Sequence, residues 1–168
     1  MPTLIWSDEL ALGVTAMDTT HQEFVDLLAD VEAADGAALI ARWQALVEHT
    51  QVHFDNEDRW MLATRFAAGN CHTTHHKMVL DVLRQGLAMG QAGDLAPIRQ
   101  MARELAVWFP QHADSMDAAL AMHLQRVGFD PASGTLAHAE ALPAEAIHGC
   151  GGVSCTPQDV SEREASAA

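Results

Sequence analysis

The sequence predicts an all-α protein: an up-down-up-down four-helix bundle with an irregular N-terminal arm and a flexible C-terminal tail. Three observations support this fold. Apolar residues recur with the 3.6-residue period of an α-helix over four long segments. Breaks of only a few residues separate these segments, and short connections favour antiparallel neighbours. Strand signals are weak, because the chain has no tyrosine, lacks β-branched runs and is rich in alanine.

The helical period predicts four helices, over residues from about 18 to 34, 38 to 66, 71 to 89 and 94 to 127. Gly36 is expected to close the first helix, since glycine readily adopts the left-handed conformation of a helix C-terminus. Asp94 is expected to cap the fourth helix, with Pro97 in its first turn, where proline is tolerated. Gly128 should end that helix.

The two ends of the chain differ from the bundle in their residue pattern. Residues 1–17 carry apolar side chains without a clean helical period, so we expect an irregular arm that packs on other elements. Residues 131–168 are rich in Ala, Gly, Ser, Pro and Glu, a composition typical of disorder. The predicted division is a bundle domain, residues 1–130, and a disordered tail, residues 131–168.

The charge and the hydropathy pattern exclude several classes of partner. The chain has 9 basic and 23 acidic residues and a net charge of -14, which disfavours nucleic acid and anionic membranes. No apolar run approaches the roughly 18 residues that a membrane span needs. The N-terminus has neither a basic region nor a long apolar stretch, so we expect no secretory signal and a cytoplasmic protein.

Three cysteines are too few and too unevenly spread to predict a disulfide framework. Cys71 is expected to be a buried or half-buried thiol. A metal-binding role is disfavoured, because on a helix Cys71 points away from residues 72 and 76. His148, Cys150 and Cys155 lie close together in the tail. They are either incidental residues of an unstructured segment or a redox-active or metal-binding clip.

Seven histidine and carboxylate residues recur along the predicted helices at spacings that suit one shared site. They are His21, His53, Glu57, His72, His76, His112 and Asp117. In the second and third helices the two members of each pair are four residues apart, hence on one face. They share that face with core residues, which is unfavourable unless something binds them. Each helix therefore directs at least one ligand-type side chain inward.

The residue types indicate two metal ions. Imidazole suits iron, zinc and copper, and a carboxylate can bridge two ions, so Glu57 and Asp117 are the expected bridges. His112 and Asp117 are five residues apart, about 140° on an ideal helix, and reach one site only by straddling it or through a local distortion. Pro110 is the expected source of a distortion.

Each of these residues, taken alone, could instead be an ordinary packed or solvated helix residue. The remaining histidines fall off the pattern and are predicted to be surface or tail residues: His49, His75, His123, His138 and His148.

The same positions resemble the hemerythrin family in its single-domain bacterial form, over roughly residues 6–127. The resemblance rests on four motifs: Trp6…Gly13-Val14…Met17-Asp18-x-x-His21, His53-x3-Glu57, His72-x3-His76 and Trp108…His112-x4-Asp117. The match departs from the family pattern at Pro110 and at residues 65–68, which lack an aromatic-proline feature.

The resemblance implies a cofactor of two Fe ions with an oxo or hydroxo bridge. It assigns one iron to His72, His76 and His112 and the other, with an open position, to His21 and His53. It also implies reversible O2 binding for oxygen storage, delivery or sensing, without catalysis. The expected partner is O2, with no nucleic acid and no membrane, and no partner protein is identified.

Reversible O2 binding requires an apolar lining that excludes water. The candidates for such an O2 pocket, for which plain core packing is an equal alternative, are Phe24, Leu28, Phe54, Trp108 and Phe109.

Two other functions are weighed against O2 binding. Di-iron enzymes of the ferritin-like class use Glu-x-x-His motifs and more carboxylates, and this chain has no such motif. Side activity toward peroxide or nitric oxide stays open. A signalling module that responds to O2, redox state or nitric oxide would need a partner protein.

Overall fold

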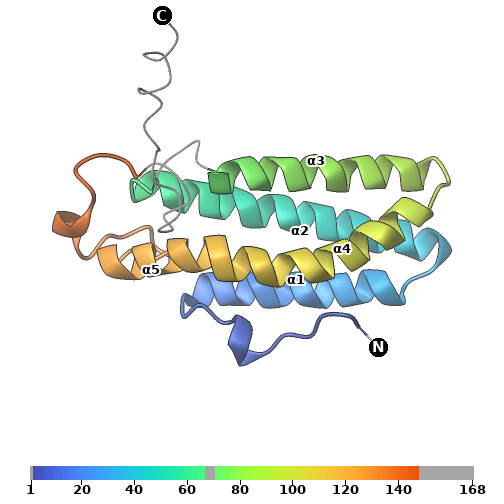
Figure 1. The fold of residues 1–168 in the computed structure, drawn as a ribbon, viewed down its shortest axis with the longest axis horizontal. Helices are drawn as coiled ribbons and strands as arrows, with labels where there is room; N and C mark the ends of the chain where they lie inside the picture. Colours follow the sequence, from blue (N-terminus) through green and yellow to red (C-terminus); the bar gives the residue numbers. More distant parts are fainter. Residues whose placement is uncertain (1, 67–70, 148–168) are drawn as a thin grey trace, which may run out of the picture.

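The computed structural model describes residues 2–66 and 71–147, and within them the fold is helical (Figure 1). The helices are α1 (Thr15–Ala33), α2 (Gly36–Ala63), α3 (Cys71–Gln91), α4 (Ala96–His112) and α5 (Ala118–Val127). A π-helical segment, η2 (Ala113–Asp117), joins α4 to α5, and two short 3-10 helices are η1 (Asp8–Leu10) and η3 (Ala139–Ala141). The only β-structure in the described residues is a single bridge between Phe129 and Leu136.

The architecture is the predicted four-helix bundle. The backbone stays in the right-handed helical region through Ala113 and Ala118, so α4, η2 and α5 form one continuous fourth helix. Helix α1 contacts α2, α2 contacts α3, α3 contacts α4, and α4 returns to α1. Figure 1 shows these helices lying along the long axis of the molecule. The all-α prediction is confirmed.

Of the two glycines expected to end helices, Gly128 does so and Gly36 does not. Gly128 closes α5 with φ of 62°, the left-handed conformation that glycine adopts without strain. Gly36 also has a positive φ, of 53°, but it is the first residue of α2. Helix α1 ends at Ala33, and the next residue, Ala34, has extended backbone. The predicted role of Gly36 in closing the first helix is therefore wrong.

The start of α4 differs slightly from the prediction. Leu95, not Asp94, holds the N-cap position, and the Asp94 carboxylate accepts a hydrogen bond from the backbone N–H of Ala96 at 3.2 Å. Pro97 lies in the first turn of α4, as expected.

Two apolar clusters fill the bundle. The first cluster includes Phe24, Leu28, Trp43, Leu46, Leu83, Ile98, Leu105 and Phe109. The second cluster comprises Val14, Met17, Met61, Phe66, Leu120, Ala121 and Leu124. Burying each large apolar side chain contributes roughly 1.5–3 kcal/mol. In α1, α2 and the fourth helix, the buried polar residues lie in sequence between members of the two clusters, so apolar layers flank them.

The N-terminal arm is fastened to two helices. The Asp18 carboxylate accepts hydrogen bonds from the backbone N–H groups of Leu12, at 2.6 Å, and Gly13, at 3.0 Å. The Gln125 side chain on α5 donates to the carbonyls of both residues at 3.2 Å. These bonds fix the last part of the arm next to α1 and α5, and Leu4 and Trp6 pack on the first cluster.

Residues 131–147 differ from the expected flexible tail. Asp130 organises a turn by accepting the N–H of Ala132 at 3.0 Å. Ile147 packs on the second cluster, and its N–H donates to the carbonyl of Arg65 at 2.9 Å. The packing of Ile147 and these hydrogen bonds thus hold the segment on the bundle, although it has few large apolar side chains. Residues 148–168, with His148, Cys150 and Cys155, lie outside the described residues, and so do the predictions made for them.

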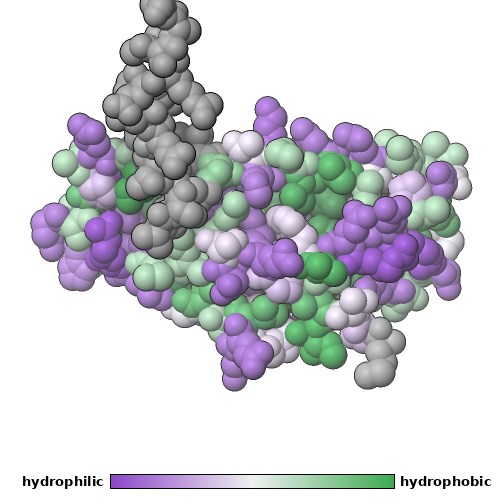
Figure 2. Space-filling model, in the orientation of Figure 1, coloured by the Kyte–Doolittle hydropathy of each residue, from purple (hydrophilic) through white to green (hydrophobic). Residues whose placement is uncertain are grey.

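The visible surface mixes hydrophilic and hydrophobic residues, with hydrophobic surface over part of α3 (Figure 2). Exposed apolar side chains there include Met78 and Val82. They border a groove of about 250 Å³ between α3 and α4, whose wall on the α4 side includes Trp108. Among the described residues, none of the helices combines the length and the apolar character needed to cross a membrane.

Candidate metal centre

The structure brings together all seven residues that the sequence singled out. α1 contributes His21, α2 contributes His53 and Glu57, α3 contributes His72 and His76, and the fourth helix contributes His112 and Asp117. Each of these residues is buried, with no more than 3% of its surface exposed. Every helix of the bundle therefore supplies a donor to one interior region.

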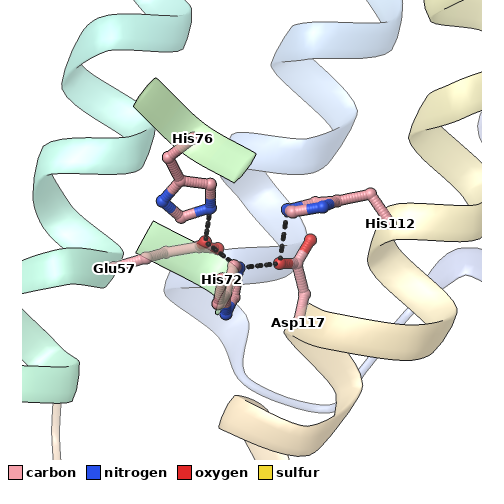
Figure 3. Close-up of side chains that lie close together, drawn as sticks. All are labelled: Glu57, His72, His76, His112 and Asp117. Atoms are coloured by element: carbon pink, nitrogen blue, oxygen red, sulfur yellow. Dashed lines mark ion pairs between the residues drawn. The ribbon is translucent and has the colours of Figure 1, made fainter. Parts of the chain in front are cut away.

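The donors form two overlapping sets. The larger set contains Glu57, His72, His76, His112 and Asp117, and Figure 3 shows these side chains converging. The smaller set contains His21, His53, Glu57 and Asp117. Within each set, one ligand atom from every residue lies within 4.8 Å of the others. The two carboxylates belong to both sets, which is the arrangement that bridging of two ions requires.

The distances in the larger set place imidazole nitrogens against carboxylate oxygens. The Nε2 atoms of His72 and His112 lie 2.9 and 3.1 Å from Oδ1 of Asp117 (Figure 3). The Nε2 atom of His76 lies 3.4 Å from Oε2 of Glu57. All three rings therefore direct the same nitrogen inward.

The smaller set uses the opposite oxygens of the same carboxylates. His53 Nε2 lies 3.1 Å from Oε1 of Glu57, and His21 Nε2 lies 3.3 Å from Oδ2 of Asp117. Each carboxylate thus offers one oxygen to one set and the other oxygen to the second set. This division is what a carboxylate does when it spans two metal ions.

Most of these short contacts are not hydrogen bonds. The Nε2 atoms of His21, His72, His76 and His112 have no hydrogen-bond partner, and neither do Oε2 of Glu57 or both oxygens of Asp117. Buried polar atoms without partners are rare and unfavourable. Here they point at shared positions between the rings and the carboxylates, so a bound cation would satisfy them together. The donor set fits a metal pair on this ground.

Without metal, the buried carboxylates of the site favour protonated imidazoles. Burial and the neighbouring Asp117 would raise the pKa of Glu57, but the surrounding imidazoles hold it well below its ordinary value. Burial would lower the pKa of His21, but the carboxylates of Asp117 and Glu57 raise it to about 9. Burial would also lower the pKa of His76, but the carboxylates of Asp58 and Glu57 raise it to about 9. Metal ions must displace these protons to bind.

A π-helical segment brings His112 and Asp117 together. The sequence predicted a local distortion of the fourth helix, with Pro110 as its source. The distortion lies instead at Ala113–Asp117, while Pro110 sits inside regular α4. Because π-helical bonding runs from residue i to residue i+5, it stacks side chains that are five residues apart. The five-residue spacing therefore suits this segment and would not suit an ideal α-helix.

Aromatic rings from α2 and α4 line the donor histidines. Phe54 stacks on His76 with ring centroids 3.9 Å apart and an interplanar angle of 4°. Trp108 stacks on His112 with ring centroids 4.5 Å apart, and Phe109 packs at a right angle to His21 with ring centroids 5.2 Å apart.

The two other candidates for an O2-pocket lining belong to the apolar cluster that also contains Phe109. Phe24 stacks on Phe109, at 4.7 Å. Leu28 belongs to the first apolar cluster.

Histidines outside the seven follow the surface prediction only in part. His75 and His138 are exposed and His49 is half-buried. His123, however, is buried, with 4% exposed, and its Nε2 donates to the carbonyl of Thr64 at 2.9 Å. The surface prediction for His123 is therefore wrong. His123 is three residues after Leu120 and four before Val127, and this helical spacing would have placed it on the buried face of α5.

Two further residues, Asp58 and Cys71, make bonds that the sequence did not reveal. Asp58 reaches across from α2, and its Oδ1 lies 2.9 Å from Nδ1 of His76 on α3. No spacing rule reports a contact between separate helices. Cys71, expected to be a thiol, is half-buried at the first residue of α3 and is disulfide-bonded.

The sequence profile of the hemerythrin HHE cation binding domain matches residues 12–124, a span that contains all seven donor residues. The chain belongs to the hemerythrin family. The resemblance drawn from the four motifs is thereby confirmed. The family description also agrees with the chemistry of the donor sets, which suits cations.

Named relatives of this hemerythrin are bacterial. It is 38% identical over 130 residues to the bacteriohemerythrin of Ralstonia nicotianae, covering 77% of this chain and 95% of that protein. It is 28% identical over 98 residues to the bacteriohemerythrin of Pseudomonas paraeruginosa, covering 56% of this chain and 64% of that one. The bacteriohemerythrin of Pseudomonas aeruginosa is 24% identical over 98 residues, with the same coverage. No solved structure matches this hemerythrin.

Proposed function

We propose that this hemerythrin binds O2 reversibly at a pair of iron ions and acts as a binding protein, not as an enzyme. The observation that carries the proposal is the unequal sharing of donors. One set has three imidazoles and the other has two, and both use Glu57 and Asp117. The ion with fewer protein ligands would keep a position open for a small molecule.

The residues of the larger set would hold one iron with His72, His76 and His112. His21 and His53 would hold the other iron, and both carboxylates would bridge the pair. Two ferrous ions in this site would supply the electrons that O2 takes up on binding and returns on release. An imidazole-rich set with only two carboxylates suits borderline metals such as iron better than Mg²⁺ or Ca²⁺.

Aromatic packing would keep the site dry enough for binding to reverse. Phe109 meets His21 on the side of the smaller set, while Phe54 and Trp108 cover rings of the larger set. An apolar shell limits solvent access and so protects a bound ligand from water and reductants. Reversible binding of this kind would serve storage, delivery or sensing of O2.

The test combines metal analysis with optical titration of the purified protein. We expect two irons per chain and a visible absorption band that appears with O2 and disappears when O2 is removed. A preparation loaded with zinc serves as the control, because zinc has no redox chemistry and should show no O2-dependent band. Fewer than two irons per chain, or only irreversible oxidation in air, would contradict the proposal.

A further inference from the structure

One of the five donor imidazoles is anchored differently from the others. The inward Nε2 atoms face the carboxylates, but the outward Nδ1 atoms of His21, His53, His72 and His112 have no hydrogen-bond partner. The Nδ1 atom of His76 instead lies 2.9 Å from Oδ1 of Asp58. Among the donor histidines, all of which lie in the described residues, His76 alone has its outer nitrogen bonded to a carboxylate.

The chemistry of this contact fixes where the ring carries its hydrogen. An ionised carboxylate only accepts hydrogen bonds, so Nδ1 of His76 must be the donor. The lone pair of the neutral ring then resides on Nε2, which faces Glu57 at 3.4 Å. Asp58 thereby selects the form of His76 that can bind a metal, and such partners commonly orient the ligands of metal sites.

Two side chains from one face of helix α2 contact the His76 ring. Phe54 and Asp58 are four residues apart, hence one turn apart on the same side of α2. Phe54 lies flat against the ring at 3.9 Å, and Asp58 holds its outer edge. The aromatic contact fixes the plane of the ring, and the hydrogen bond fixes its rotation within that plane.

Asp58 also connects a buried ligand to the protein surface. Its side chain is 40% exposed, whereas that of His76 is 2% exposed. The neighbouring residue in sequence, Glu57, is fully buried and faces the centre. Two consecutive acidic residues therefore serve one histidine from its opposite edges, Glu57 at Nε2 and Asp58 at Nδ1.

We propose that Asp58 is a positioning residue that fixes His76 and, through the negative charge of its carboxylate, lowers the reduction potential of the metal pair. A carboxylate on the outer nitrogen makes the imidazole a more basic ligand, which favours the oxidised metal. This inference rests on the proposed di-iron function, and it adds a residue that controls how readily the pair is oxidised.

The experiment compares three variants of the full chain loaded with iron. Asp58→Asn keeps the size and an oxygen acceptor but removes the charge, while Asp58→Ala removes both. Asp55→Asn is the matched control, because Asp55 is an exposed residue of α2 that accepts from Gln51 and does not contact a donor histidine. The readouts are the midpoint potential and the rate at which a chelator removes iron.

We expect Asp58→Asn to shift the midpoint potential upward relative to the wild type and to Asp55→Asn, with little loss of iron. We expect Asp58→Ala to lose iron about 10- to 100-fold faster, in the range that removal of such a partner causes. Asp58 is partly exposed, so neither change leaves a buried cavity.

Equal potentials in Asp58→Asn and Asp55→Asn would overturn the electronic part of the proposal. Unchanged iron release in Asp58→Ala would overturn the positioning part. Both results require that the wild-type chain hold two irons. A wild-type chain without iron would instead refute the proposed function, so the two failures are distinguishable.

Discussion

His112 and Asp117 face one another across one π-helical turn, with Nε2 of the histidine 3.1 Å from Oδ1 of the carboxylate. The pair joins the last residue of α4 to the last residue of η2. Asp117 also lies near His72 and His21, so its position determines whether both donor sets are complete.

Inserting one alanine after Ser115 should separate this pair, because the two side chains would then be six residues apart. On an α-helix, six residues place them about 120° from each other. We expect iron content to fall from two per chain toward zero while circular dichroism retains its helical signal. Ser115→Ala is the control, because Ser115 is exposed and the substitution keeps the length of the segment. Full iron loading of the insertion variant would show that the spacing of the pair does not decide metal binding.

Single donor substitutions should distinguish the two iron positions. His53 belongs only to the smaller set, whereas Glu57 belongs to both. We expect His53→Ala to keep about one iron per chain and Glu57→Ala to lose both, as measured by elemental analysis of the purified variants. Equal iron content in the two variants would argue against a shared bridging carboxylate.

The metal-free protein should lose stability as pH rises from about 6.5 to 9. The folded-state pKa values of His21 and His76 are raised to about 9, above the ordinary 6.5. Their protonated rings therefore stabilise the fold fully below pH 6.5, and this contribution disappears as pH passes through about 9. Each unit of pKa difference corresponds to about 1.4 kcal/mol.

Urea unfolding of the metal-free chain at several pH values measures this effect. The pKa values of His49, His75 and His123 are lowered, so their contributions change below pH 6.5 and leave the window unaffected. The same series on metal-free His76→Gln should show a smaller slope. Stability that rises with pH over this window would contradict the assigned charges.

His123 should contribute to stability and not to metal binding. Its ring packs on Phe66 at 4.9 Å, and its bond to the carbonyl of Thr64 ties α5 to the end of α2. We expect His123→Ala to reduce the free energy of unfolding by about 1–3 kcal/mol, because it leaves a buried carbonyl without its donor. Iron content should stay unchanged. Exposed His75→Ala provides the comparison, and equal stability of both variants would contradict this role.

The fold was predictable because each level of the sequence pointed to the same structure. The apolar period marked the helices, and the four-residue spacing of His53 and Glu57 placed both on one buried face. The convergence of all seven donor residues followed from their inward phase on separate helices. Their role as iron ligands remains part of the proposed function.

What the sequence did not reveal depends on contacts between distant segments. Asp58 meets His76 only because α2 and α3 pack side by side. The segment after residue 130 looked disordered by composition, yet Ile147 packs on the second apolar cluster. Pro110 looked like the cause of the distortion, since proline removes a backbone donor, but the helix absorbs it within α4.

The extra residue in η2 also makes the spacing of His112 and Asp117 informative about metal binding in related chains. Two side chains five residues apart face each other only where the winding of the helix loosens. A relative with one residue fewer could keep both on one face of a regular α-helix, whereas a relative with one residue more would turn its carboxylate toward a neighbouring helix. Counting the residues between these two positions would therefore show which chains need a loosened turn to house a metal pair.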